Sequence, residues 1–136
     1  GNPAGITSVG DLADADNTIG VCAAAVPCGA LAVDAATGLD IDLAADTEEP
    51  NVRALATKIA LGEIDAGLVY ATEAAALDLE TVGAAELGPW RTEYLAATVP
   101  AEPPAAVTAV LTAVIGDEGA AVLAAAGFSA PNETTP

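Results

Sequence analysis

The 136-residue sequence predicts an α/β domain, with a mostly parallel sheet and helices on both of its faces. Strand-like and helix-like segments alternate between residues 18 and 70, as in crossover units in which a helix links two parallel strands. Hydrophobic residues make up 53% of the chain and charged residues 17%, so the chain can build a core and is not expected to be disordered.

The first elements follow from local composition. Residues 6–13 are predicted to form a short helix, and the apolar, β-branched run at 18–22 is predicted to form a strand. The alanine- and leucine-rich segment that starts at Cys28 predicts a helix ending near Gly38, because glycine readily adopts the conformation that ends helices.

Two further strands complete the predicted sheet. One is expected at residues 40–44, and the uninterrupted apolar run at 66–70 is typical of a buried parallel strand. Between them Asn51 can cap a helix that ends at Gly62. The sequence therefore predicts three strands joined by two helices.

The C-terminal part is predicted to be less regular. A short helix is expected at 72–77 and a strand at 92–99, before a proline-rich break. Two apolar helices are then predicted at 105–115 and 118–126, and the tail at 129–136 is predicted to be disordered.

The charge excludes several functions. The formal net charge is −17, and the three basic residues, Arg53, Lys58 and Arg91, cannot neutralise a run of phosphates. Nucleic acid is therefore not expected as a partner.

Without histidine, a conventional catalytic triad cannot form within the chain and a zinc site would need distant carboxylates. We expect no catalytic residues, no metal ligands and no cofactor, and hence no enzyme.

Cys22 and Cys28 are the only cysteines, and their role has several interpretations. Five residues separate them, whereas a redox CxxC centre has two, so a thioredoxin-type centre is disfavoured. Two buried reduced thiols remain possible, and a structural disulfide is favoured if the protein is exported.

Three positions at strand ends could bind an anion. Pro27-Cys28 and Asn51-Val52 each begin a predicted helix, where backbone N–H groups lack helical partners. Tyr70 ends the third predicted strand, and ligands of open parallel sheets bind at the carboxyl ends of the strands. These positions could form an oxyanion cradle, although a tyrosine packed at the rim of the sheet is the simpler interpretation.

Four collinear segments resemble the periplasmic molybdate-binding proteins of ABC transporters, which have the type II solute-binding fold. "NPAGITSVGDLAD" resembles the opening of that family's second lobe, and "VCAAAVPCGALA" its first ligand loop. "EEPNVRALATKIALGEIDAGLVYATEA" resembles its second ligand helix and the tyrosine strand, and "GDEGAAVLAAAGF" its C-terminal helix. Together these motifs cover most of residues 2–128.

The resemblance implies an extracytoplasmic protein, periplasmic or at the cell surface and with or without a lipid anchor. It would bind molybdate or tungstate and deliver the anion to a membrane permease. Carried over by position, the ligand contacts would be the backbone N–H groups of Cys28 and Val52 and the hydroxyl of Tyr70. The implied oxidising location also predicts a disulfide between Cys22 and Cys28.

The same resemblance implies that this chain is part of a two-lobed receptor. Residues 1–99 would form the second, ligand-binding lobe, and residues 100–128 would return to a first lobe that is absent from the sequence. The apolar helices of that segment could otherwise mediate self-association. The alternative function is a redox or regulatory α/β domain that uses Cys22 and Cys28 without binding an oxyanion.

Overall fold

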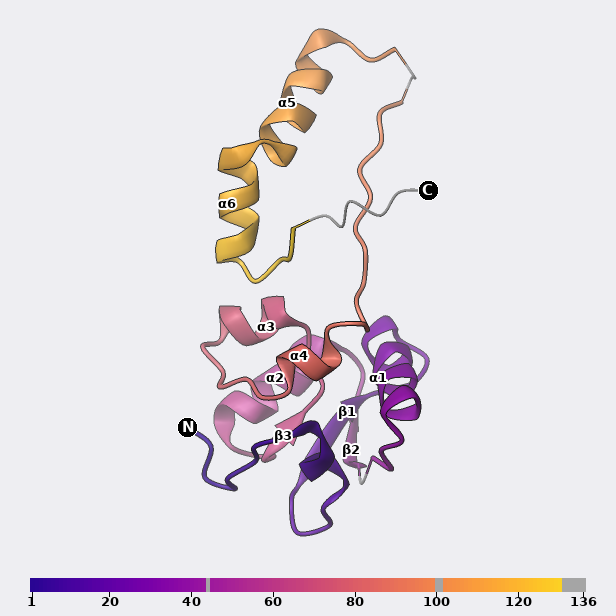
Figure 1. The fold of residues 1–136 in the computed structure, drawn as a ribbon, viewed down its shortest axis with the longest axis vertical. Helices are drawn as coiled ribbons and strands as arrows, with labels where there is room; N and C mark the ends of the chain where they lie inside the picture. Colours follow the sequence, from indigo (N-terminus) through magenta and orange to yellow (C-terminus); the bar gives the residue numbers. More distant parts are fainter. Residues whose placement is uncertain (44, 100–101, 131–136) are drawn as a thin grey trace. The chain divides into compact units, whose positions relative to one another are not determined.

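The structure is a computed structural model that describes residues 1–43, 45–99 and 102–130. The chain divides into two compact units, Gly1–Arg91 and Thr92–Pro136, which are described separately below (Figure 1). The predicted boundaries at 99 and 128 stay a prediction, and most of the predicted disordered tail, residues 131–136, lies outside the described residues.

The first unit contains a three-stranded sheet in the order β2-β1-β3, which confirms the predicted α/β class. Strand β1 (Ile19–Cys22) pairs in parallel with β2 (Ala45–Glu49) on one side and with β3 (Ala66–Gly67) on the other. Cys22 lies opposite Glu49 in this register. All three carboxyl ends therefore lie at one edge of the sheet.

Helices connect the strands and cover the sheet (Figure 1). The 3-10 helix η1 precedes β1, α1 links β1 to β2, and α2 links β2 to β3. Two short helices follow β3, and the second of them occupies a stretch for which no helix was predicted. The bounds are η1 Val9–Ala13, α1 Pro27–Leu39, α2 Val52–Leu61, α3 Ala71–Ala76 and α4 Ala84–Leu87.

Two hydrophobic clusters form the core of the first unit. The first cluster consists of Ile6, Val9, Leu12 and Ile19. The second cluster consists of Cys22, Cys28, Leu55 and Ile64. Because side chains alternate along a strand, Ile19 and Cys22 of β1 point to opposite faces. The two clusters therefore lie on opposite sides of the central strand.

Strand β2 begins five residues later than predicted. Ile41 and Leu43, which predicted a strand at 40–44, instead pack against the first cluster outside the sheet. The polar segment Ala45–Glu49 takes the edge position. Its Asp46 carboxylate accepts a hydrogen bond of 2.8 Å from the N–H of Ile19, which ties the strand to the start of β1.

The amino edge of the sheet carries a second carboxylate. Asp65, which directly precedes β3, accepts a hydrogen bond of 2.8 Å from the N–H of Thr18 through its side chain. Its own N–H donates to the carbonyl of Thr18 at 2.8 Å. Acidic side chains thus satisfy the backbone donors where β1 begins.

Helix α1 ends one residue beyond Gly38, close to the predicted position. Its last residue is Leu39, and Asp40 adopts the left-handed conformation with φ of 56°. A Cβ at position 38 would collide with the indole of Trp90, so the glycine allows the helix to pack closely against that ring. Sequence alone does not distinguish this use of glycine from helix termination.

One further strand prediction was too long and another was wrong. Only Ala66–Gly67 of the predicted strand at 66–70 pairs with β1, and residues 66–70 are half-buried rather than buried. Residues 92–99, predicted as a strand, form no strand in the described part of the chain. Both runs have strand-like composition, but residues 68–70 and 92–99 have no partner strand.

The second unit contains α5 (Ala105–Ile115) and α6 (Asp117–Ala125), close to their predicted bounds. The rings of Tyr94 and Phe128 meet edge to face, with centroids 5.8 Å apart. No residue of either helix is buried. No single helix in the described residues is long and apolar enough to cross a membrane; α5 and α6 meet that criterion only together and are bent by 52°.

Candidate functional site

The candidate site lies at the carboxyl edge of the sheet. Because β1, β2 and β3 are parallel, the segments that follow them all leave from this edge. The first two lead into the N-termini of α1 and α2, and the third leads through Tyr70 into α3. Helix N-termini carry unpaired N–H groups and a partial positive charge, so this edge suits an anion.

The first donor segment is the loop from β1 to α1. Its Ala23 N–H donates to the carbonyl of Glu49 at 2.8 Å, which fixes the loop to the end of β2. The N–H groups of Gly29 and Ala30 both donate to the carbonyl of Val26. No acceptor among the described residues takes the N–H of Cys28, so this donor is unpaired.

Gly29 allows this loop to be tight. A Cβ at this position would overlap the carbonyl group of Ala23 and lie 2.6 Å from the carbonyl oxygen of Cys22. Any larger residue would push the first turn of α1 away from the end of β1. Position 29 therefore requires glycine for a steric reason, which the sequence pattern alone did not reveal.

A disulfide joins Cys22 to Cys28, with their Cα atoms 5.8 Å apart. It links the last residue of β1 to the first turn of α1. Both cysteines are buried, with 3% and 7% of their surface exposed. The crosslink lies in the second cluster, beside the Cys28 N–H.

The second donor segment is the start of α2. The side chain of Asn51 accepts a hydrogen bond of 2.9 Å from the N–H of Ala54, which confirms the predicted cap. The carbonyl of Asn51 accepts from Leu55 at 3.3 Å. Among the described residues, no acceptor takes the N–H groups of Val52 and Arg53. These two donors remain available at the helix end.

Tyr70 provides the third element. It is the N-cap residue of α3, and its carbonyl accepts from the N–H groups of Glu73 and Ala74 at 3.0 and 3.1 Å. Its half-buried side chain packs against the second cluster, as do the side chains of Val52 and Val26. The structure thus brings Cys28, Val52 and Tyr70 together around one cluster.

An ion pair lies beneath the edge of β2. Lys58 of α2 donates to the Glu49 carboxylate at 2.5 Å and to the hydroxyl of Thr47 at 3.3 Å. Thr47 also donates to Glu49. Hydrogen bonds from Lys58 and then from Thr47 lower the pKa of Glu49, although burial of the carboxylate opposes the shift. Glu49 therefore stays ionised, and Lys58 balances its charge.

A second ion pair lies between the starts of α2 and α3. Arg53 Nη1 and Glu73 Oε2 are 3.1 Å apart. Neither ion pair was predicted from the sequence, because neither follows from helical spacing or from a motif. They depend on how α2 packs against β2 and α3.

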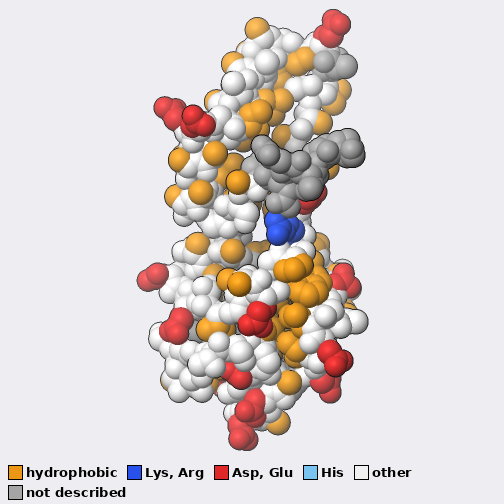
Figure 2. Space-filling model, viewed as in Figure 1, with side chains coloured by type: hydrophobic (Ala, Val, Ile, Leu, Met, Phe, Trp, Pro, Cys, Tyr) orange, Lys and Arg blue, Asp and Glu red, His pale blue; other side chains and the backbone are white. Residues whose placement is uncertain are grey.

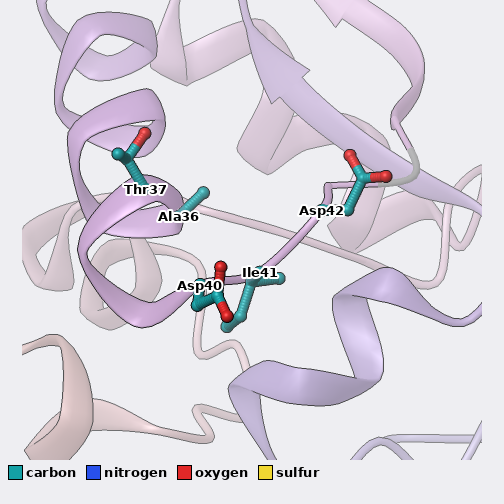
Figure 3. Close-up of a pocket in the computed structure, with 5 residues that line it drawn as sticks. All are labelled: Ala36, Thr37, Asp40, Ile41 and Asp42. Carbon is teal, nitrogen blue, oxygen red and sulfur yellow. The ribbon is translucent and has the colours of Figure 1, made fainter.

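A hollow of the first unit lies elsewhere. It has a volume of about 310 Å³ and lies at the C-terminal end of α1, where the Asp40 and Asp42 carboxylates are found (Figure 3). Carboxylates repel an anion, so this hollow is not a candidate oxyanion site. In the described residues no three His, Cys, Asp or Glu side chains gather in a way that could hold a metal ion.

Acidic side chains are spread over the visible face of the first unit rather than gathered in one patch (Figure 2). The distribution of charged side chains does not mark the candidate site, which is marked instead by its unpaired backbone N–H groups. A parallel sheet with unpaired backbone donors at its carboxyl edge is the arrangement expected of a ligand-binding α/β domain of the solute-binding class.

Comparison with known proteins agrees with this class. A model of the bacterial extracellular solute-binding protein family matches residues 1–129, and the chain belongs to this family. Over 76 residues it is 37% identical to the molybdate-binding protein ModA of Mycobacterium bovis and to that of Mycobacterium tuberculosis. The match covers 54% of this chain and 28% of the length of each relative. No solved structure matches the chain.

Proposed function

We propose that this chain is the ligand-binding part of an extracytoplasmic solute-binding protein that carries a tetrahedral oxyanion, molybdate or tungstate, to an ABC importer. The observation that supports this function best is the arrangement around the second cluster. The free N–H groups of Cys28 and Val52 begin two helices at the same sheet edge, and Tyr70 packs on the same cluster. The name of the mycobacterial relatives supports molybdate as the ligand.

Neutral donors suit this ligand. A doubly charged oxyanion is held by several N–H and O–H groups aimed at its oxygens, and the partial positive charge of helix N-termini adds to the attraction. The ligand then needs no fixed cation and no resident metal or cofactor. In this proposal the N–H groups of Cys28 and Val52 and the hydroxyl of Tyr70 each bind an oxyanion oxygen.

The donors of this chain surround only part of a tetrahedral anion, so the remaining oxygens need donors from elsewhere in the receptor. We assign residues 1–99 to one ligand-binding lobe and residues 100–128 to a segment that packs on a further lobe. A membrane permease is the partner that receives the ligand. The relatives are much longer than the matched region, which is consistent with this arrangement.

The proposed role is binding without catalysis. The alternative, a redox domain that uses Cys22 and Cys28, would need a sulfur that a partner thiol can reach. Both cysteines are buried in the second cluster and joined to each other. This placement favours a structural role for the disulfide.

The experiment titrates molybdate, tungstate, sulfate and phosphate into the gene product that contains this chain, with isothermal calorimetry as the readout. We expect molybdate and tungstate to bind and Tyr70→Phe to weaken both by about ten- to a hundredfold, because a lost hydrogen bond to a charged group costs about 1.5–3 kcal/mol. Cys28→Ala keeps the backbone N–H and should cost affinity only through loss of the disulfide.

Tyr94→Phe is the matched control, because Tyr94 is the second of two tyrosines and lies in the other unit, with 76% of its surface exposed. It should leave affinity unchanged. If none of the four anions binds, the proposed function is wrong. If molybdate binds equally well to Tyr70→Phe, the tyrosine is not part of the site.

A further inference from the structure

Arg53 stands in an unfavourable position for a cation. It follows Val52 in the first turn of α2, where the helix dipole presents its positive end. The chain has only three basic residues, so a cation at this helix start is conspicuous. A cation at this position does not stabilise α2, so the placement of Arg53 needs another explanation.

The partner of Arg53 explains this placement. Its Nη1 lies 3.1 Å from Oε2 of Glu73, in the first turn of α3. Glu73 N–H in turn donates to the carbonyl of Tyr70 at 3.0 Å. The ion pair therefore connects the turn that carries Val52 to the turn that carries Tyr70.

We propose that the Arg53–Glu73 pair is a clamp that positions two ligand donors, the Val52 N–H and the Tyr70 hydroxyl, at the separation a tetrahedral oxyanion requires. This inference rests on the proposed function and adds Arg53 and Glu73 to it as positioning residues. In this proposal neither side chain contacts the anion. The pair is also neutral, so the clamp places no net charge beside the ligand.

Exposure of the pair sets the expected size of the effect. The Arg53 side chain is 65% exposed and the Glu73 side chain 23% exposed. Pairs this close to solvent couple weakly, so breaking the clamp should reduce affinity by roughly two- to fivefold rather than abolish binding. The effect should shrink at high salt, which screens exposed charges.

The experiment measures molybdate affinity for the unaltered gene product and for Arg53→Gln, Glu73→Gln and the double exchange R53E/E73R. Both single variants should bind two- to fivefold more weakly. The double exchange should restore affinity to within about twofold, because it rebuilds the pair with reversed polarity. A role limited to general stability instead predicts a lower urea midpoint in the single variants and an unchanged molybdate affinity of the folded protein.

Glu63→Gln is the matched control, since it removes one negative charge from the same unit just beyond the opposite end of α2. It should leave affinity unchanged. Urea unfolding of each variant verifies that it is folded under the conditions of the titration.

The signs of the two single effects decide between mechanisms. If Arg53 attracted the anion directly, Glu73→Gln would free the cation and strengthen binding, and this result would overturn the clamp. Unchanged affinity in both single variants, or no rescue by the double exchange, would also overturn it. If the unaltered protein binds no oxyanion, the proposed function itself fails and the clamp fails with it.

Discussion

Opening the Cys22–Cys28 disulfide should lower the stability of the first unit by an amount that follows from the length of the loop it closes. The two cysteines are six positions apart. The chain-entropy relation for a closed loop of this size gives about 2.2 kcal/mol at 25 °C. Reduction tests this value better than substitution, because both sulfurs remain in the second cluster and no cavity forms.

The assay is urea unfolding of the oxidised and the reduced chain, followed by the fluorescence of Trp90. Trp90 is the sole tryptophan, and its ring contacts Gly38 of α1, so its emission reports on the packing of the first unit. A urea dependence of about 2 kcal/mol per M is typical for a small unit. The midpoint should therefore fall by about 1 M on reduction.

Alkylation of the reduced thiols in urea, followed by mass determination, verifies that the bond was intact before reduction and open after it. Equal midpoints for fully oxidised and fully reduced protein would refute the prediction that this crosslink stabilises the site loop. Two alkylatable thiols in protein purified without reductant would show that the disulfide does not form.

Two further predictions concern the same unit. Asn51→Ala removes the hydrogen bond from the Ala54 N–H and should lower the free energy of unfolding in urea by about 1 kcal/mol. Asn51→Asp keeps an acceptor at the helix start and should retain most of this stability. An unchanged urea midpoint in Asn51→Ala would contradict the role of the cap. Folding lowers the pKa of Glu49, so its contribution to stability is present above about pH 4.5 and is lost as the pH falls through the folded-state pKa. Between pH 6 and pH 3 the free energy of unfolding should therefore fall more steeply in the unaltered protein than in Glu49→Gln. Equal pH dependence in the two proteins would contradict a stabilising role of the Glu49 carboxylate.

The sequence predicted the order of elements in the first unit well, because the alternation of apolar runs and caps is local information. Asn51 and Gly62 mark the true ends of α2, and Cys28 lies in the first turn of α1. The position of β2 was wrong for a physical reason. Ile41 and Leu43 are apolar because they pack on the first cluster, and β-strand composition does not distinguish this from burial within the sheet.

The placement of the three candidate site positions at one sheet edge could be predicted from the sequence, because each position follows a strand. In a parallel sheet this alone places Cys28, Val52 and Tyr70 at one edge. Arg53 and Glu73 could not be found in this way. They are separated by 20 residues, and their contact depends on how α2 packs beside α3.

The two edges of the sheet carry opposite electrostatic character. At the amino edge the carboxylates of Asp46 and Asp65 accept the first N–H groups of β1, whereas the carboxyl edge presents helix N-termini. An approaching anion therefore meets a field that repels it from one end of the strands and draws it toward the other. At physiological ionic strength this field extends only about 8 Å, so it orients the last step of the encounter rather than the long-range search. Under the proposed function, this difference between the two edges explains how a chain with a formal net charge of −17 can bind an anion.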